Sequence, residues 1–257
     1  MHRHPPISKL QSRIRRLWAA LFWLLVWQLA AMSVGQRLLL PSPLASLARL
    51  AQLAQTSAFW RSVLFTLSHI LAGFFGAMAV GAAAGALAAR FRGIRDLFAP
   101  LIAAAKSVPV ASFVIVALIW VPSRRLSVLI SFLIALPLIY TAVLDGLAAV
   151  DPGLREMARV FRMSPWNRLT RIELPAVLPR LSSSAGVAMG LAWKSGVAAE
   201  VIGIPAGSIG ERLYKAKVYL ATPELFAWTL TIVLASVLCE RALRLCLRST
   251  VRAMERM

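Results

Sequence analysis

Long apolar segments recur along this 257-residue chain, and they constrain its fold more than any other feature of the sequence. Residues 17–35 form the first segment, which is long enough to cross a hydrocarbon core of about 30 Å as a helix. The other apolar segments cover residues 62–89, 97–121, 126–147, 181–202 and 225–247. Charged residues make up 15% of the chain, whereas soluble domains usually carry about 25%. We therefore predict an all-α polytopic membrane protein with about six transmembrane helices.

The basic residues predict how these helices are oriented. The formal net charge is +19, which by itself could suggest nucleic-acid binding. Arginine instead concentrates in the two tails and in alternate loops, as the positive-inside rule expects of cytoplasmic segments. We expect both termini in the cytoplasm, with an uncleaved first helix rather than a signal peptide, whose apolar region would be about 7–15 residues. The predicted division is a basic tail at 1–16, the first helix and an outer loop at 17–61, a membrane core at 62–247 with a cytoplasmic loop at 151–179, and a second basic tail at 248–257.

Small residues indicate how the helices pack. Gly73, Ala77, Gly81 and Gly85 recur every four residues in the second segment, and Gly186 and Gly190 repeat that spacing in the fifth. Such stripes let helix backbones approach closely in a membrane, so packing is preferred here to a hinge.

Enzyme signatures are missing from the sequence. No GxxxxGK[ST] phosphate loop occurs, so the chain is not expected to hydrolyse ATP. The three histidines have no metal-ligand spacing, and no HExxH or CxxC occurs, so we predict no metal and no cofactor. Cys239 and Cys246 would lie about 10 Å apart along one helix, too far for a disulfide. The glycine-rich stretch at 203–210 follows a membrane segment, which favours an outer loop over a nucleotide site.

The segment EMARVFRMSPWNRLTRIELPAVLP, residues 156–179, differs from its apolar neighbours. Asp151-Pro152 predicts a helix start before it, with an N-cap side chain and proline at the first position. An apolar stripe then follows at helical spacing and consists of Leu154, Met157, Ala158 and Phe161. We expect Ser164-Pro165 to end this helix and to begin a second short helix, which Pro175 ends. Helices this short need a surface to pack on, which is either anionic lipid or the groove of a cytoplasmic partner.

The same segment resembles the cytoplasmic signature loop of binding-protein-dependent ABC importer permeases. Glu156 and Ala158, followed by Ile172, Leu174 and Pro175, match its glutamate-alanine-alanine and isoleucine-x-leucine-proline elements. Residues 106–120 and 199–217 resemble the third core helix and the outer loop of the nitrate, sulfonate and taurine branch, and the resemblance extends over roughly residues 60–250. Met157 stands at the second alanine and Arg162 at the glycine, so we expect the helix to continue to Ser164 before the chain turns.

The resemblance implies a type I permease fold and a function. Such a chain is a multi-pass inner-membrane permease subunit that pairs with a second permease subunit, identical or not. An ABC ATPase would dock on the coupling helices, and an external binding protein would deliver a small solute such as nitrate, a sulfonate or taurine. The implied ATPase-coupling residues are Glu156, Met157, Ala158, Phe161, Arg162, Ile172, Leu174 and Pro175. The alternatives are an ATP-independent channel or secondary transporter, for which no inverted repeats stand out, and a membrane-bound enzyme.

Two lysines lie inside predicted spans, where charge is costly and usually faces a bundle interior or a watery cavity. Lys194 follows Gly186 and Gly190 at four-residue spacing, so we expect it on their packing face. Glu200 lies about 240° farther around that helix and is a poor partner for Lys194. Lys194 and Lys106 could therefore line a path for an anion, or each could bond helix-end carbonyls or extend to the membrane interface.

Overall fold

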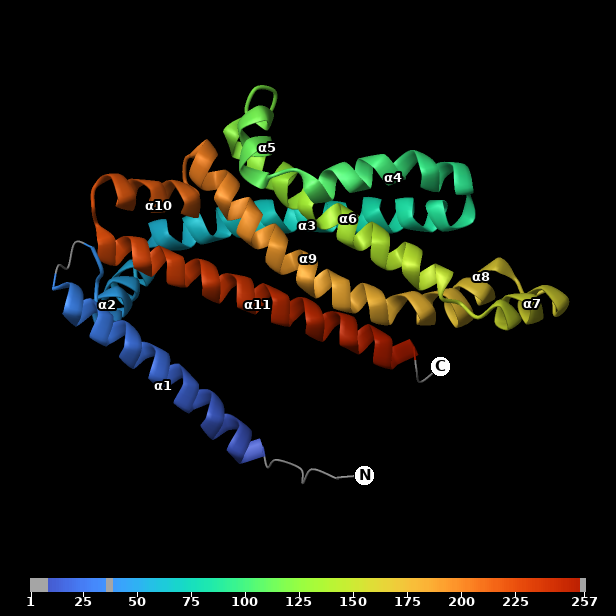
Figure 1. Ribbon diagram of the computed structural model, residues 1–257, viewed down its shortest axis with the longest axis horizontal. Helices are drawn as coiled ribbons and strands as arrows, with labels where there is room; N and C mark the ends of the chain where they lie inside the picture. Colours follow the sequence, from blue (N-terminus) through green and yellow to red (C-terminus); the bar gives the residue numbers. More distant parts are fainter. Residues whose placement is uncertain (1–8, 36–38, 255–257) are drawn as a thin grey trace.

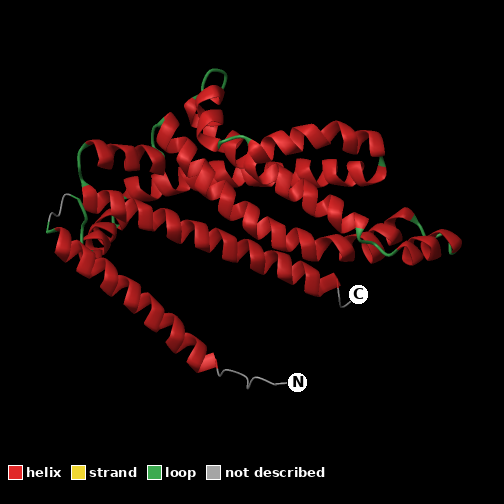
Figure 2. Ribbon diagram, viewed as in Figure 1, coloured by secondary structure: helices red, strands yellow, loops and turns green. Residues whose placement is uncertain are grey.

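The computed structural model describes residues 9–35 and 39–254, and every regular element in these ranges is a helix (Figure 2). In chain order they are α1 (Lys9–Val34), α2 (Pro43–Ala54), α3 (Ser57–Arg90), α4 (Arg92–Ser107), α5 (Val110–Ala117), α6 (Ser123–Ala148), α7 (Pro152–Val160), α8 (Pro165–Arg168), the π-helix η1 (Leu169–Glu173), α9 (Leu174–Gly203), α10 (Ile209–Val218) and α11 (Thr222–Met254). The long helices α3, α6, α9 and α11 run lengthwise, with α7 and α8 at one end and α2 and α10 at the other (Figure 1).

The six predicted spans lie largely in helices, but fewer of these helices qualify as membrane-crossing. Within the described residues only α3 and α6 are long and apolar enough to cross a membrane, or three spans if the bent pair α4 and α5 counts as one, and Leu21–Val34 is a shorter apolar helix. The helices α9 and α11, which cover the fifth and sixth predicted spans, do not meet this criterion. The third predicted span is not one straight helix, because α4 and α5 together are apolar enough but are bent by 105°. Pro109 explains this break, since the residue before a proline is disfavoured in the α conformation and Val108 is extended (φ −69°, ψ 127°). The predicted tails are also partly helical, because α1 begins at Lys9 and α11 continues to Met254.

The small-residue stripe of α3 is used for close helix packing, as predicted, and the structure shows that its partner is α6. Gly73, Ala77, Gly81 and Gly85 are all buried. A Cβ atom on Gly85 would lie 2.8 Å from the Tyr140 carbonyl oxygen, and one on Gly73 would lie 2.9 Å from Ser131 Cβ. Real side chains do not fit at these distances, so glycine allows the two backbones to approach this closely.

The helix α9 completes the core by packing on α6. Gly196 faces α6 and α3, where an added Cβ would lie 2.6 Å from Ser131 Oγ and 2.8 Å from Ile70. The Ser131 hydroxyl donates to the Ala192 carbonyl at 3.0 Å. The three helices α3, α6 and α9 thus form one packed unit, and its two ends carry the segments that the sequence singles out for function.

The predicted end of a second short helix at Pro175 is wrong. The chain is helical without interruption from Pro165 to Gly203, and Pro175 lies in the first turn of α9. A proline in a helix removes one backbone hydrogen bond. The π-turn of η1 precedes it, with the Leu174 N–H bonded to the Leu169 carbonyl, and this wider turn accommodates the proline.

Candidate functional site

The loop between α6 and α9 begins with the predicted cap. The Asp151 carboxylate accepts a hydrogen bond from the Gly153 N–H at 2.7 Å, and Pro152 occupies the first turn of α7. The Ser164 hydroxyl likewise accepts from the Asn167 N–H at 3.3 Å and caps α8. Both helix starts predicted from the sequence are confirmed.

The end of α7 differs from the prediction. The helix stops at Val160 rather than continuing to Ser164, because Arg162 itself adopts the left-handed conformation (φ 48°). The Met163 N–H bonds to the Ala158 carbonyl at 2.9 Å, and the Arg162 N–H bonds to the Arg159 carbonyl at 3.1 Å. These two bonds form a Schellman cap, the turn that a glycine usually completes. Arginine therefore replaces the expected glycine without changing the shape of the turn.

Several of the predicted coupling residues are internal to the loop. Ala158 and Ile172 are buried and pack with Val150, while Met163 lies against them. Leu174 is half-buried and Pro175 is exposed, both in the first turn of α9. Ala158 and Ile172 thus hold α7 against η1, directly before α9, and neither presents a surface to another protein.

The other predicted coupling residues are on the surface. Glu156 is exposed, Met157 is 42% exposed and Phe161 is 75% exposed. Val160 and Trp166 on the same loop are 71% and 70% exposed. The helices α7 and α8 lie at one end of the molecule, beyond the end of α6 (Figure 1). The loop therefore combines an internal core with an apolar outer surface.

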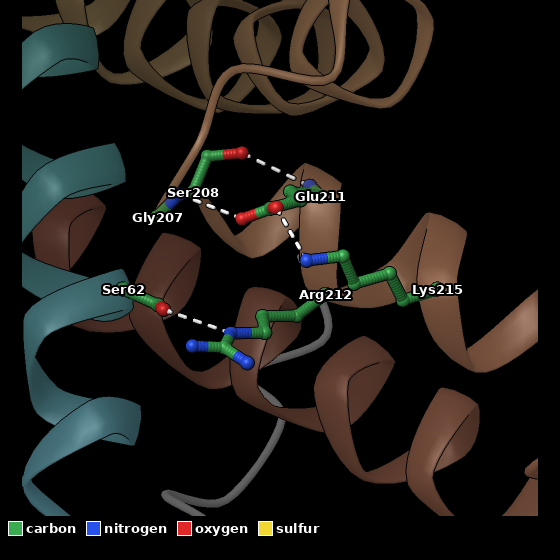
Figure 3. A network of polar contacts seen from close by, with 6 residues as sticks. All are labelled: Ser62, Gly207, Ser208, Glu211, Arg212 and Lys215. Carbon is green, nitrogen blue, oxygen red and sulfur yellow. Dashed lines mark hydrogen bonds and ion pairs between the residues drawn. The ribbon is translucent and has the colours of Figure 1, made fainter.

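The opposite end of the core carries α10, which a polar network holds in place (Figure 3). Ser208 caps α10 by accepting from the Glu211 N–H at 2.9 Å, and Glu211 accepts from the Gly207 N–H and from Lys215 Nζ, each at 2.6 Å. Burial by itself raises the pKa of Glu211, but its hydrogen bonds to Lys215 and Gly207 outweigh this effect and hold the pKa below its usual value. Arg212 reaches back to Ser62 of α3 at 3.5 Å, so the network also ties α10 to α3.

A buried carboxylate forms a second link between α10 and the core. Glu200, near the end of α9, is fully buried, and its Oε2 accepts from Thr66 Oγ1 at 2.7 Å and from the Gly210 N–H at 3.3 Å. Thr66 in turn accepts from the Ile209 N–H at 3.0 Å. The first N–H groups of α10 have no partner within their own helix, and Glu200 and Thr66 satisfy two of them. We name these residues, Thr66, Glu200, Ile209 and Gly210, the Glu200 cluster.

Sequence reasoning considered Glu200 only as a partner for Lys194 and missed this cluster. The available signal was an acidic residue within an apolar segment, which usually marks a paired or functional group. Gly210 supplies a second constraint, because a Cβ there would lie 2.6 Å from Val201 N. Only glycine lets α10 approach the α9 backbone closely enough for this contact.

The predicted packing face of Lys194 is not observed. Gly186 is buried against Arg244 of α11, but nothing lies within 4 Å of a Cβ built on Gly190, and Lys194 is exposed. The reason is rotation, since four residues advance an α-helix by about 400°, and two such steps turn the side chain about 80° from the first glycine. Lys106 is also exposed, in the last turn of α4. Neither lysine has a hydrogen bond or an ion pair with any residue in the described ranges.

An all-α bundle with a helical loop between α6 and α9 is the fold expected of a multi-pass permease. The chain belongs to the family described as "Binding-protein-dependent transport system inner membrane component", whose model matches residues 77–252. It is therefore an inner-membrane permease subunit of an ABC importer, a class of transporter that works with an ATPase and a solute-binding protein. The family consists of transport permeases rather than enzymes.

Curated relatives and a solved structure agree with this assignment. The chain is 28% identical to the riboflavin transport system permease protein RibX of Chloroflexus aurantiacus, with 90% of this chain and 91% of the relative covered. It is 25% identical to the taurine transport system permease protein TauC of Escherichia coli (85% and 81% covered) and to the bicarbonate transport system permease protein CmpB of Synechococcus elongatus (76% and 74% covered). The fold is similar to that of a bacterial ABC transporter that imports alginate, with a TM-score of 0.58 at 18% identity, covering 96% of this chain and 99% of that chain. The predicted family and the predicted type I permease fold are confirmed.

Removing the Glu200 carboxylate should loosen α10. Glu200→Ala leaves the Gly210 N–H and the Thr66 hydroxyl without their acceptor, and buried groups left in this way cost about 1–3 kcal/mol. We expect faster amide hydrogen exchange across 204–221 and a lower unfolding temperature of the purified protein. Glu200→Gln is the control, because an amide oxygen can replace Oε2 as the acceptor for Thr66 Oγ1 and for the Gly210 N–H. Equal rates of amide hydrogen exchange in the wild type, Glu200→Ala and Glu200→Gln would contradict the role of this carboxylate.

Proposed function

We propose that the loop at 151–179 is the docking site of the ATPase subunit of this importer. The observation that carries the proposal is the exposure of Phe161, whose side chain is 75% exposed although the loop has its own buried core. Because Val150, Ala158 and Ile172 already stabilise the loop internally, Phe161 and Met157 are not needed to hold it together. Apolar side chains on a short helix with no internal role are typical of a helix that lies in a groove of a partner.

Each loop residue has a proposed role. Met157 and Phe161 enter the groove of the ATPase, and Glu156 meets a basic or backbone N–H group at its rim. Arg162 supports these contacts by forming the turn that ends α7, and Ala158 and Ile172 support them by holding α7 against η1. Leu174 and Pro175 begin the helix that leads into the membrane. The nucleotide is hydrolysed by the ATPase, and this chain supplies no catalytic residue.

Phe161→Glu should abolish co-purification of the co-expressed ATPase and abolish transport, because a carboxylate would be desolvated in an apolar groove. Membrane insertion should be unchanged, since Phe161 contributes nothing to the loop core. Val218→Glu is the matched control, because Val218 is also an exposed apolar residue (57%) on a short helix but lies on α10 at the other end of the molecule. If the loop rests on lipid instead, Phe161→Glu and Val218→Glu would both retain the ATPase.

We also propose that the loop end of the molecule is cytoplasmic and the α10 end is external. The arginine-rich loop and tails support this orientation. The described ends of α1 and α11 that lead into the two termini both point toward the loop end (Figure 1). The external surface, which includes α2 and α10, then faces the solute-binding protein, and the predicted segments at 17–61 and 62–247 supply the first span and the permease core.

Cysteine labelling tests this orientation. In a variant with Cys239 and Cys246 replaced by serine, a cysteine at Tyr219, which is 78% exposed on the α10 side, should react with a membrane-impermeant maleimide added outside cells. A cysteine at Asn167 in the loop should react only after the cells are opened. The reversed pattern would disprove both the orientation and the docking of a cytoplasmic ATPase on this loop.

The transported solute is proposed to be a small anion. The named solutes of two relatives, bicarbonate and taurine, carry an anionic group, whereas that of the RibX relative is riboflavin. Similarity to relatives thus leaves the charge of the solute open, and the exposed lysines supply the support. Lys194 lies on the same uncovered side of α9 as Val187 and Leu191, which are 52% and 40% exposed. A lysine without an ion-pair partner on a membrane helix is stabilised if it faces a watery path between two permease subunits.

Lys194→Met should lower the uptake of an anionic solute while leaving assembly with the ATPase and ATP hydrolysis intact. The cause is loss of the positive charge from the path, so Lys194→Arg should retain most of the uptake. Uptake of radiolabelled solute by proteoliposomes is the measurement, and Lys106→Met tests the second lysine in the same way. Unchanged uptake by Lys194→Met in an assembled complex would remove Lys194 from the path.

A further inference from the structure

Three arginines from three different helices line one small cavity beside the loop. Arg90 ends α3, Arg155 lies on α7 and Arg168 ends α8. The cavity has a volume of about 190 Å³, which is several times the roughly 30 Å³ that one water molecule occupies in the liquid. Alanines of α3 form one wall and leave the space open. We name this cavity the arginine pocket.

Two of the three positive charges in the arginine pocket are not neutralised. Glu173 also lines the pocket, and its carboxylate pairs with Arg168 Nε at 2.8 Å. Arg155 donates to the Leu147 carbonyl oxygen, which is an uncharged acceptor at the end of α6. Arg90 has no hydrogen bond or ion pair within the described residues, and its guanidinium lies over the Phe91 ring at 6.0 Å. The pocket therefore has a net charge of about +2 and keeps many unused N–H donors.

The position of the arginine pocket indicates where its ligand comes from. The helix α3 has 34 residues and is about 51 Å long at 1.5 Å per residue, which exceeds a hydrocarbon core of about 30 Å. Its last turn carries Arg90, whose charge would be costly within the hydrocarbon core. We therefore infer that this turn, together with the end of α6, lies at the level of the phospholipid head groups. Basic pockets between membrane helices at this level bind anionic head groups.

We propose that the arginine pocket binds a phosphate group, and that this phosphate belongs to an anionic phospholipid. The planar guanidinium group presents paired N–H donors that match two phosphate oxygens. A bound phosphate would bridge Arg90 of α3 and Arg155 of α7, so it would hold the loop against the membrane core. This lipid dependence is separate from the ATPase docking proposed above.

A binding assay on the purified full-length chain in detergent tests the proposal without the ATPase. The probes are fluorescent phosphatidylglycerol and a diacylglycerol that lacks the phosphate. The wild type should prefer phosphatidylglycerol, and Arg90→Gln should weaken its binding about fivefold, as expected for one arginine at a charged surface. Arg90→Gln with Arg155→Gln should weaken it further. The matched control is Arg171→Gln, because Arg171 is exposed on η1 but does not line the pocket.

The outcomes separate the possible sources of the phosphate. Binding of phosphatidylglycerol that resists millimolar inorganic phosphate supports the lipid, whereas displacement by inorganic phosphate supports a site for soluble phosphate. The proposal is overturned if Arg90→Gln binds like the wild type, or if Arg171→Gln weakens binding as much as Arg90→Gln. Unchanged thermal unfolding of Arg90→Gln shows that a loss of binding is not a loss of fold, because Arg90 makes no polar contact that its replacement would break.

Discussion

The close contact between α3 and α6 is the constraint on which the rest of this structure depends. In lipid the hydrophobic effect does not drive helices together, so packing of small residues and polar contacts must do so. Glycines at positions such as Gly73 and Gly85 let the α3 backbone meet α6, and Gly196 brings α9 onto the same pair. This three-helix unit positions the loop at one end and α10 at the other. The positions of both functional regions therefore depend on the few glycines that allow α3, α6 and α9 to pack closely.

The sequence predicted the features that local chemistry determines. The caps at Asp151 and Ser164 and the glycine stripe of α3 depend on neighbouring residues, and all three are found. The turn at Arg162 could not be predicted in this way. A left-handed residue other than glycine costs about 1–2 kcal/mol. Here the turn is stabilised by the Schellman bonds and by Met163, which packs against Ala158 and Ile172, and Ile172 is distant in the sequence.

Lys194 and Glu200 show why the sequence could not assign the charged residues of α9. They lie six residues apart on one helix, yet Lys194 is exposed and Glu200 is fully buried. The difference depends on which other elements cross each face of α9. Thr66 of α3 and Gly210 at the start of α10 cover Glu200 and supply its hydrogen bonds, and Thr66 lies 134 residues away in the sequence. The bend between α4 and α5 is partly a similar case, because Pro109 explains the break itself, while the direction that α5 then takes is accompanied by packing of Val114 and Ala117 with Ala199 of α9.

The helix α9 gives the two ends of the molecule a mechanical connection. It is continuous from Leu174 to Gly203, about 45 Å at 1.5 Å per residue, with the loop core at its start and Glu200 near its end. An α-helix of packed side chains resists compression, so α9 holds the loop core and Glu200 at a fixed separation along its axis. Thr66 belongs to α3, which does not follow the loop directly. The Thr66–Glu200 hydrogen bond therefore fixes the end of α9 against α3, and the Gly210 N–H, which donates to the same carboxylate oxygen, fixes the first turn of α10 beside them.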